Sequence, residues 1–222
     1  MSFWRKILAI TWKDALSEMR TREIVFSVLA FTILIIVIFN FAFGATQEAA
    51  LVAPGILWVT FAFAGVLSFN RSFILEKEDG CLEGLMGCPV SREVIYAGKM
   101  LGSLLFMLII QAITLPIFAF FFNLEVLSVQ LVVIIVSTTI GFVAVGTLFS
   151  ALAVNTKARE MVLPILFFPI VVPIIISAVR ASGLAISGEP WSSLFLWLQM
   201  IVAFDVIFLV ASFLIFTFVI EE

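Results

Sequence analysis

The sequence predicts an all-α, polytopic membrane protein with six transmembrane helices and an N-terminal interfacial helix. Of its 222 residues, 64% are hydrophobic and 12% are charged, whereas a soluble domain averages about 45–50% apolar and about 25% charged residues. A globule of this size could not bury that much apolar surface, so lipid must cover the excess. This composition excludes a soluble enzyme, a nucleic-acid-binding domain and a disordered chain.

Hydropathy divides the chain into spans and connections. A helix of roughly 20 apolar residues can cross about 30 Å of hydrocarbon, and six stretches satisfy this requirement. Together they contain one charged residue, Asp205. We therefore expect residues 1–222 to form a single transmembrane domain, whose spans are 24–43, 51–69, 100–122, 126–154, 161–179 and 194–220.

The basic residues predict the orientation of these spans. Of the twelve Lys and Arg, all but Arg180 lie before the first span, between the second and third, or between the fourth and fifth. Cytoplasmic loops of membrane proteins are enriched in Lys and Arg. The N- and C-termini are therefore expected in the cytoplasm, and Arg180 at the opposite face.

Residues 2–20 precede the first span and are predicted to form an interfacial helix. Trp4, Leu8 and Trp12 recur at helical spacing, and Lys6 and Lys13 lie opposite them. An amphipathic helix of this kind lies along the membrane surface. It would act either as an anchor that sets the topology or as an elbow helix that contacts a cytoplasmic partner.

Residues 70–99 form the predicted cytoplasmic coupling loop. Gly80 can make a turn before a short helix at 81–86, and Gly87 and Pro89 would end that helix. A rigid, acidic peg of this kind would dock into a groove on a soluble subunit, whereas the alternative is a solvated loop. The residues expected to make the contact are Glu76, Asp79, Gly80, Leu82, Glu83, Leu85, Met86 and Pro89.

Small residues and prolines suggest how two of the spans pack. Gly98 and Gly102 are four residues apart, a spacing that lets two helices approach closely, within one chain or between two copies. The fifth span contains Pro164, Pro169 and Pro173. Each proline removes a backbone donor and favours a kink, so this span is expected to be bent, and either static or mobile.

Asp205 lies near the middle of the sixth span. An acid at this depth costs roughly 2.5–3.5 kcal/mol on insertion scales, so it must face a partner or a water-filled cavity. Two interpretations remain open: a residue of a substrate path or subunit contact, and a structural hydrogen bond to a neighbouring Ser, Thr or Gln.

The chain lacks the residues that common cofactor and catalytic sites require. It contains no histidine and two cysteines, Cys81 and Cys88, so we expect no metal site, no directly bound cofactor and no Ser-His-Asp triad. It also lacks the G-x-x-x-x-G-K-[ST] phosphate-binding motif. We therefore expect the chain to have no catalytic activity, and any ATP with its Mg²⁺ to be bound by a separate subunit.

Several segments resemble known transporter families. Residues 79–85, Asp-Gly-Cys-Leu-Glu-Gly-Leu, and the Pro-Val-Ser at 89–91 resemble a loop pattern of ABC-2-type permeases. Residues 53–59, Ala-Pro-Gly-Ile-Leu-Trp-Val, are more specific, as are Phe-Asn-Arg at 69–71 and the proline-rich run 163–173. Together they resemble the CcmB family, the haem exporter B proteins of cytochrome c maturation.

The resemblance implies a role and a set of partners. It places the chain in a bacterial inner membrane, as a homodimer that binds a CcmA-like ATPase. CcmC- and CcmD-like membrane proteins would lie beside it, and no nucleic-acid partner is expected. The complex would pass haem to the periplasmic chaperone CcmE, or use ATP to release haem-loaded CcmE from CcmC. Within the coupling loop at 70–99, the peg at 81–89 would then be the coupling helix. The absence of histidine fits the second role better, because no obvious side chain would ligate haem iron.

Two other functions fit the same sequence features. The loop pattern also occurs in ABC-2-type exporters of lipids, polysaccharides or drugs. A non-transporting membrane scaffold would need only the six spans and surfaces for its partners.

Overall fold

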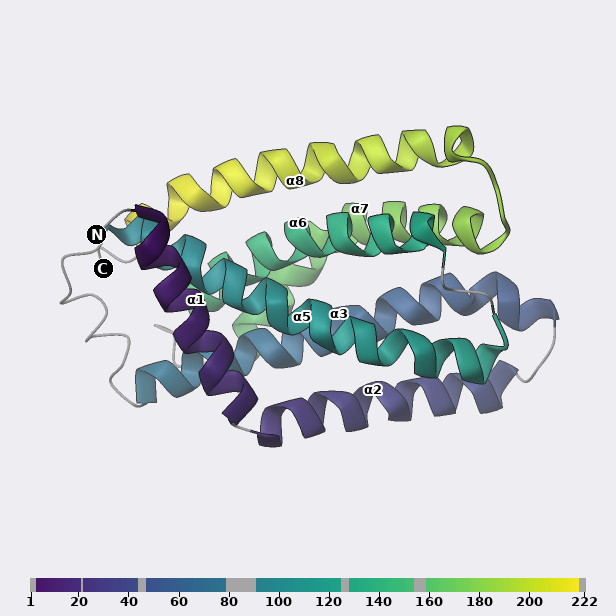
Figure 1. Ribbon diagram of the computed structural model, residues 1–222, viewed down its shortest axis with the longest axis horizontal. Helices are drawn as coiled ribbons and strands as arrows, with labels where there is room; N and C mark the ends of the chain where they lie inside the picture. Colours follow the sequence, from purple (N-terminus) through teal and green to yellow (C-terminus); the bar gives the residue numbers. More distant parts are fainter. Residues whose placement is uncertain are drawn as a thin grey trace.

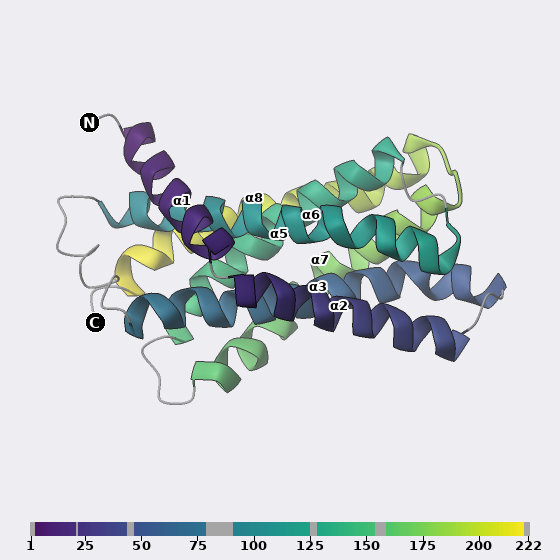
Figure 2. The ribbon, with the colours of Figure 1, turned by 60° about the horizontal axis from the view of Figure 1, so that its bottom comes forward.

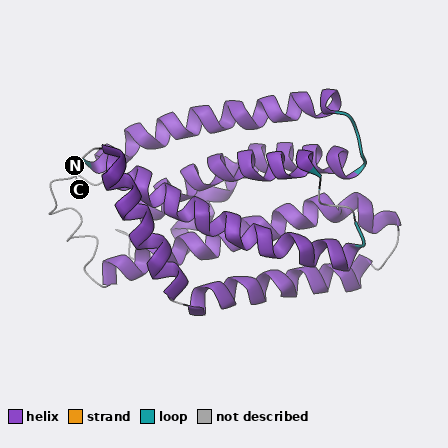
Figure 3. Cartoon of the chain, in the orientation of Figure 1, coloured by secondary structure: helices purple, strands orange, loops and turns teal. Residues whose placement is uncertain are grey.

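The computed structural model describes residues 3–20, 22–43, 47–78, 91–124, 128–153 and 159–219. Nearly all of these residues are helical, and they include no strand (Figure 3). The all-α prediction is thus confirmed. The helices are α1 (Phe3–Arg20), α2 (Arg22–Phe43), α3 (Gln47–Glu78), α5 (Arg92–Phe122), α6 (Val129–Ala153), α7 (Arg159–Ile186) and α8 (Trp191–Val219).

Six of these helices are long and apolar enough to cross a membrane, as predicted. They run roughly side by side along the long axis of the molecule (Figure 1). The candidate spans within them are Val25–Phe43, Leu51–Phe69, Arg92–Phe122, Val129–Ala153, Leu163–Ile186 and Trp191–Phe216.

Two helices extend well past their predicted spans. α3 continues to Glu78, beyond the predicted limit at residue 69, and α5 begins at Arg92 instead of residue 100. Charged residues end a hydropathy window but do not break a helix, because Lys, Arg and Glu are good helix formers. The connection between α3 and α5 therefore spans residues 79–91, a shorter stretch than the predicted loop at 70–99.

α6 occupies the centre of the helix bundle. Residues 141–148 are all buried, so neighbouring helices surround this part of α6 on every side. Gly146 is needed there, because a Cβ atom at this position would overlap the ring of Phe69 on α3. Two hydrogen bonds join α6 to its neighbours: Ser150 Oγ donates to the Phe69 carbonyl at 2.7 Å, and Tyr96 Oη of α5 donates to the Ala144 carbonyl at 3.0 Å.

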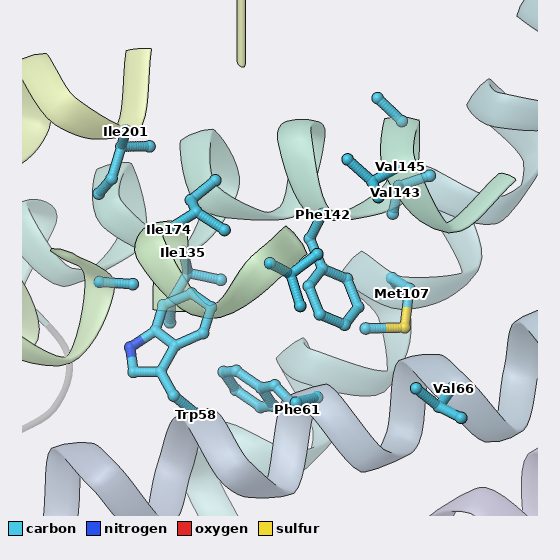
Figure 4. Packing of buried hydrophobic residues seen from close by; sticks show 14 of the residues in the cluster. Trp58, Phe61, Val66, Met107, Ile135, Phe142, Val143, Val145, Ile174 and Ile201 are labelled. Atoms are coloured by element: carbon cyan, nitrogen blue, oxygen red, sulfur yellow. The ribbon is translucent and has the colours of Figure 1, made fainter. Parts of the chain in front are cut away.

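Aromatic side chains fill the space between α3 and α6. Trp58 and Phe61 point from α3 toward Phe142 of α6 (Figure 4), and all three are at most 4% exposed. Phe142 also contacts Phe167 of α7 edge-to-face, with ring centroids 4.8 Å apart. Such pairs add roughly 0.5–1.5 kcal/mol to the burial of their surface, so this cluster ties α3, α6 and α7 together.

α1 crosses the bundle obliquely at the end where both chain termini lie (Figure 1). Its apolar residues form two faces. Trp4, Leu8 and Trp12 are 62–71% exposed, as expected for a helix that rests on lipid, whereas Ile7 and Ile10 are buried. The buried face packs on the first turns of α5, with Val94 and Ile95. The sequence pattern had revealed only the exposed face.

Candidate coupling site

The predicted contact residues lie at the junction of α3 and α5. Glu76 is in the last turn of α3. Ser91 precedes α5 with extended backbone angles, and its carbonyl accepts the amide of Val94 at 3.0 Å. The remaining predicted residues lie outside the described part of the chain: Asp79, Gly80, Leu82, Glu83, Leu85, Met86 and Pro89. Their coupling role stays a prediction.

Gly98 and Gly102 lie where α5 meets α1. A Cβ atom on Gly98 would come within 2.7 Å of Ile10 Cβ, and one on Gly102 within 3.1 Å of Asp14 Cβ. Thr11 Oγ1 lies at hydrogen-bond distance from two carbonyls, Ile7 at 3.0 Å and Gly98 at 3.1 Å. The glycines thus allow α1 to lie directly on the backbone of α5, and this contact is within one chain.

A buried ion pair joins the same two helices. Lys99 Nζ of α5 lies 3.6 Å from Asp14 Oδ2 of α1, and Lys13 Nζ lies 3.1 Å from Asp14 Oδ1. The side chains of Lys99 and Asp14 are only 2% and 8% exposed. Sequence reasoning missed this pair. The available signal was Asp14 itself, which falls on the same helical face as Ile7 and Ile10 and interrupts an apolar stripe with a charge.

The junction therefore holds α1 against the start of α5, so we expect the two helices to move together. It combines close backbone packing, a hydrogen bond and a buried ion pair. α5 begins at Arg92, directly after the connection that contains the predicted contact residues. A force applied to that connection would reach both α3 and α5, and α1 would move with α5.

Asp205 lies on the other side of the bundle, on α8. It is 7% exposed, and its carboxylate faces Gly141 of α6, where a Cβ atom would overlap Oδ1. Oδ1 has no hydrogen-bond partner among the described residues, and the same holds for the buried hydroxyl of Thr138, one turn from Gly141 on α6. A buried polar atom without a partner is rare in folded proteins. The predicted Ser, Thr or Gln partner of Oδ1 is thus not found in the described part of the chain.

The three prolines are accommodated within one continuous helix. Pro164, Pro169 and Pro173 all lie inside α7, the last two exposed and the first half-buried. Ser177 Oγ donates to the Pro173 carbonyl at 2.9 Å. Figure 2 shows the first turns of α7 projecting below α3 at the α1 end of the bundle. The prolines therefore lie on a helix that runs from this projecting end to the opposite end.

Comparison with known proteins decides the family. Residues 5–221 match the model of the CcmB protein family, which is nearly the whole chain of 222 residues. The chain belongs to the CcmB family. The matched region includes the α1–α5 junction, the connection at 79–91 and Asp205.

Individual CcmB relatives agree with the family match. The chain is 32% identical to heme exporter protein B of Rhodobacter capsulatus over 165 residues, which cover 71% of this chain and 76% of that protein. It is 28% identical to heme exporter protein B of Pseudomonas aeruginosa over 179 residues, or 79% of each chain. The protein of the same name from Haemophilus influenzae is 28% identical over 80% of this chain and 82% of its own length.

The described part of this CcmB family member holds no group of three or more metal-ligating side chains. The full sequence contains no histidine, which removes the commonest metal ligand and the usual axial ligand of haem.

Proposed function

We propose that this chain is the membrane subunit of an ATP-driven complex of cytochrome c biogenesis. The observation that carries the proposal is the CcmB match over residues 5–221, together with relatives named heme exporter protein B. The subunit couples ATP hydrolysis by a separate CcmA-like ATPase either to haem export or to release of haem-loaded CcmE from CcmC. It has no catalytic role of its own.

The proposed coupling route begins at the connection between α3 and α5. The ATPase would dock on Glu76, Asp79, Leu82, Glu83, Leu85, Met86 and Pro89. Movement there is passed to α5, and the Lys99–Asp14 pair makes α1 follow. A homodimer of this chain with two ATPase subunits would provide two such routes, and CcmC- and CcmD-like proteins would lie beside it in a bacterial inner membrane.

The docking step can be tested by charge reversal. Replacing both Asp79 and Glu83 with Lys should abolish co-purification of the membrane subunit with its ATPase, because two attractive contacts become repulsive. The control is Arg5→Glu, which also alters charge on the cytoplasmic side but lies at an exposed position on α1. Retained ATPase binding by the loop variant would contradict the docking site.

The biological role is tested in a deletion strain. Loss of this chain should remove c-type cytochromes and leave haem on the chaperone. Haem-stained gels of membrane fractions would measure both, with a plasmid-borne copy of the gene as the control. Normal cytochrome levels in the deletion strain would reject the role in cytochrome c biogenesis.

A further inference from the structure

A cavity of about 420 Å³ lies at the end of the bundle opposite α1, where α7 connects to α8 (Figure 1). Three helices line it. Leu51 and Pro54 come from the start of α3, Arg180 and Gly183 from the end of α7, and Trp197 from α8. The cavity thus lies far from the coupling site, at the level where the helices leave the apolar part of the bundle.

The lining combines apolar walls with one cation. Arg180 has no ion pair or hydrogen bond with the residues that the structure describes. Glu189, in the connection between α7 and α8, has other contacts: Ser193 Oγ lies 3.4 Å from its carboxylate, and its carbonyl accepts Gln130 Nε2 at 3.0 Å. Arg180 is also the one basic residue placed at this end by the charge pattern. Among the described residues, its guanidinium is thus paired with no anion.

The α3–α7 wall of the cavity is fixed by a buried contact behind it. Trp58 Nε1 donates to Ser182 Oγ at 2.9 Å, and both side chains are buried. Gly183 faces Pro54, and a Cβ atom there would lie 3.6 Å from Pro54 Cγ, an ordinary contact distance, so a small side chain would just fit. The space beside Gly183 is thus held open by a rigid frame, and a larger side chain at this position would fill it.

We propose that this cavity binds an amphipathic anion. A carboxylate or phosphate would pair with the Arg180 guanidinium, whose planar donors match both groups bidentately. The apolar body of the ligand would lie between Leu51, Pro54 and the indole of Trp197. Small-molecule sites typically have this composition, with mostly apolar walls and a few polar groups that orient the ligand.

Two ligands share this chemistry. Haem has a flat apolar ring with two propionates, and an anionic phospholipid has acyl chains with a phosphate. The choice of haem as the first probe rests on the proposed function, whereas the preference for an amphipathic anion rests on the cavity alone. The site requires no iron ligand, which agrees with a chain that contains no histidine.

The test uses the purified full-length chain in phosphatidylcholine nanodiscs. Haem is titrated and its binding followed by the Soret band and by quenching of tryptophan fluorescence. Arg180→Gln should weaken binding about tenfold or more, as expected for loss of a charged hydrogen bond, and Arg180→Lys should restore part of it. Gly183→Leu should weaken binding by filling the cavity, and haem dimethyl ester should bind the wild type and Arg180→Gln equally.

A second arm identifies the source of the anion. Brominated phosphatidylglycerol should quench tryptophan more than brominated phosphatidylcholine does, and Arg180→Gln should remove the difference. Sensitivity to Arg180 and Gly183 in either arm supports the site and shows which ligand occupies it. Insensitivity of both arms to both variants overturns it.

Two controls keep the result interpretable. Arg5→Gln removes the same charge from an exposed position on α1 and should leave binding unchanged, and each variant must elute as a single species with wild-type thermal stability. If neither variant weakens binding but the gene still restores c-type cytochromes in the deletion strain, the proposed binding site is wrong and the proposed function stands. If the deletion strain keeps normal c-type cytochromes but binding depends on Arg180 and Gly183, the proposed function is wrong and the binding site stands.

Discussion

Asp14 and Asp205 are two equally buried acids with opposite surroundings. Each is 7% exposed. Asp14 lies at the α1–α5 junction, 3.6 Å from the ammonium group of Lys99. Asp205 lies in α8 against Gly141, and its Oδ1 has no hydrogen-bond partner among the described residues. Burial is thus the same in both places, while the partner differs.

The difference determines what each acid contributes. Removing one member of a buried ion pair leaves the other as an uncompensated charge, which is strongly destabilising. Asp205 has no cation beside it among the described residues, so neutralising its side chain should cost less. We therefore expect the Asp14 cluster to hold the fold together, and Asp205 to be dispensable for stability and retained for another reason.

The largest expected effect comes from removing the buried cation. Lys99→Met should lower the free energy of unfolding by about 3–5 kcal/mol, because Asp14 would remain buried beside a partner that is largely in solvent. The matched control is Lys13→Met. Its side chain is 43% exposed, so the loss should stay below about 1 kcal/mol. Unfolding by SDS in mixed micelles measures both, and equal losses would remove the distinction between them.

A smaller effect is expected from closing the gap between α1 and α5. Gly98→Ala places a Cβ atom 2.7 Å from Ile10 Cβ, and overpacking of this kind costs about 1–3 kcal/mol. Gly55→Ala is the control, because a Cβ atom there meets nothing within 4 Å. The same SDS unfolding assay applies. If both alanines are tolerated equally, α1 does not pack on α5 as closely as the structure has it.

The smallest effect is expected at Asp205. Asp205→Asn keeps the shape of the side chain and removes its charge, so the free energy of unfolding should change by less than about 1 kcal/mol. Asp14→Asn serves as the comparison and should destabilise by more, since it weakens the pair with Lys99. A loss at Asp205 as large as that at Asp14 would show that Oδ1 has a stabilising partner after all.

The sequence predicted the spans well and the contacts between them poorly. Hydropathy predicted six spans, and the described residues contain six helices long and apolar enough to cross a membrane, because transfer to lipid depends on each residue separately. The Lys99–Asp14 pair depends on two positions 85 residues apart, and local periodicity carries no information about such a distance.

The candidate coupling residues show the same limit. Glycine and proline at Gly80 and Pro89 predict a turn and a helix stop from local geometry. The contact between α1 and α5, the helix that follows the loop, could not be predicted, because it depends on tertiary packing. The cavity at Arg180 was equally hidden, since it brings together residues from α3, α7 and α8.

The position of α1 also has a consequence for synthesis of the chain. Thr11 and Gly98, which hydrogen-bond across the junction, are 87 residues apart. At roughly 5–20 residues per second, a ribosome needs about 4–17 s to add that length. During this interval the N-terminal helix lacks its docking surface on α5, and its exposed tryptophans would keep it at the membrane surface. α1 is the first helix to be synthesised, but it can reach its final position only once the start of α5 has been made. By then the chain of α2 and α3 has already been synthesised.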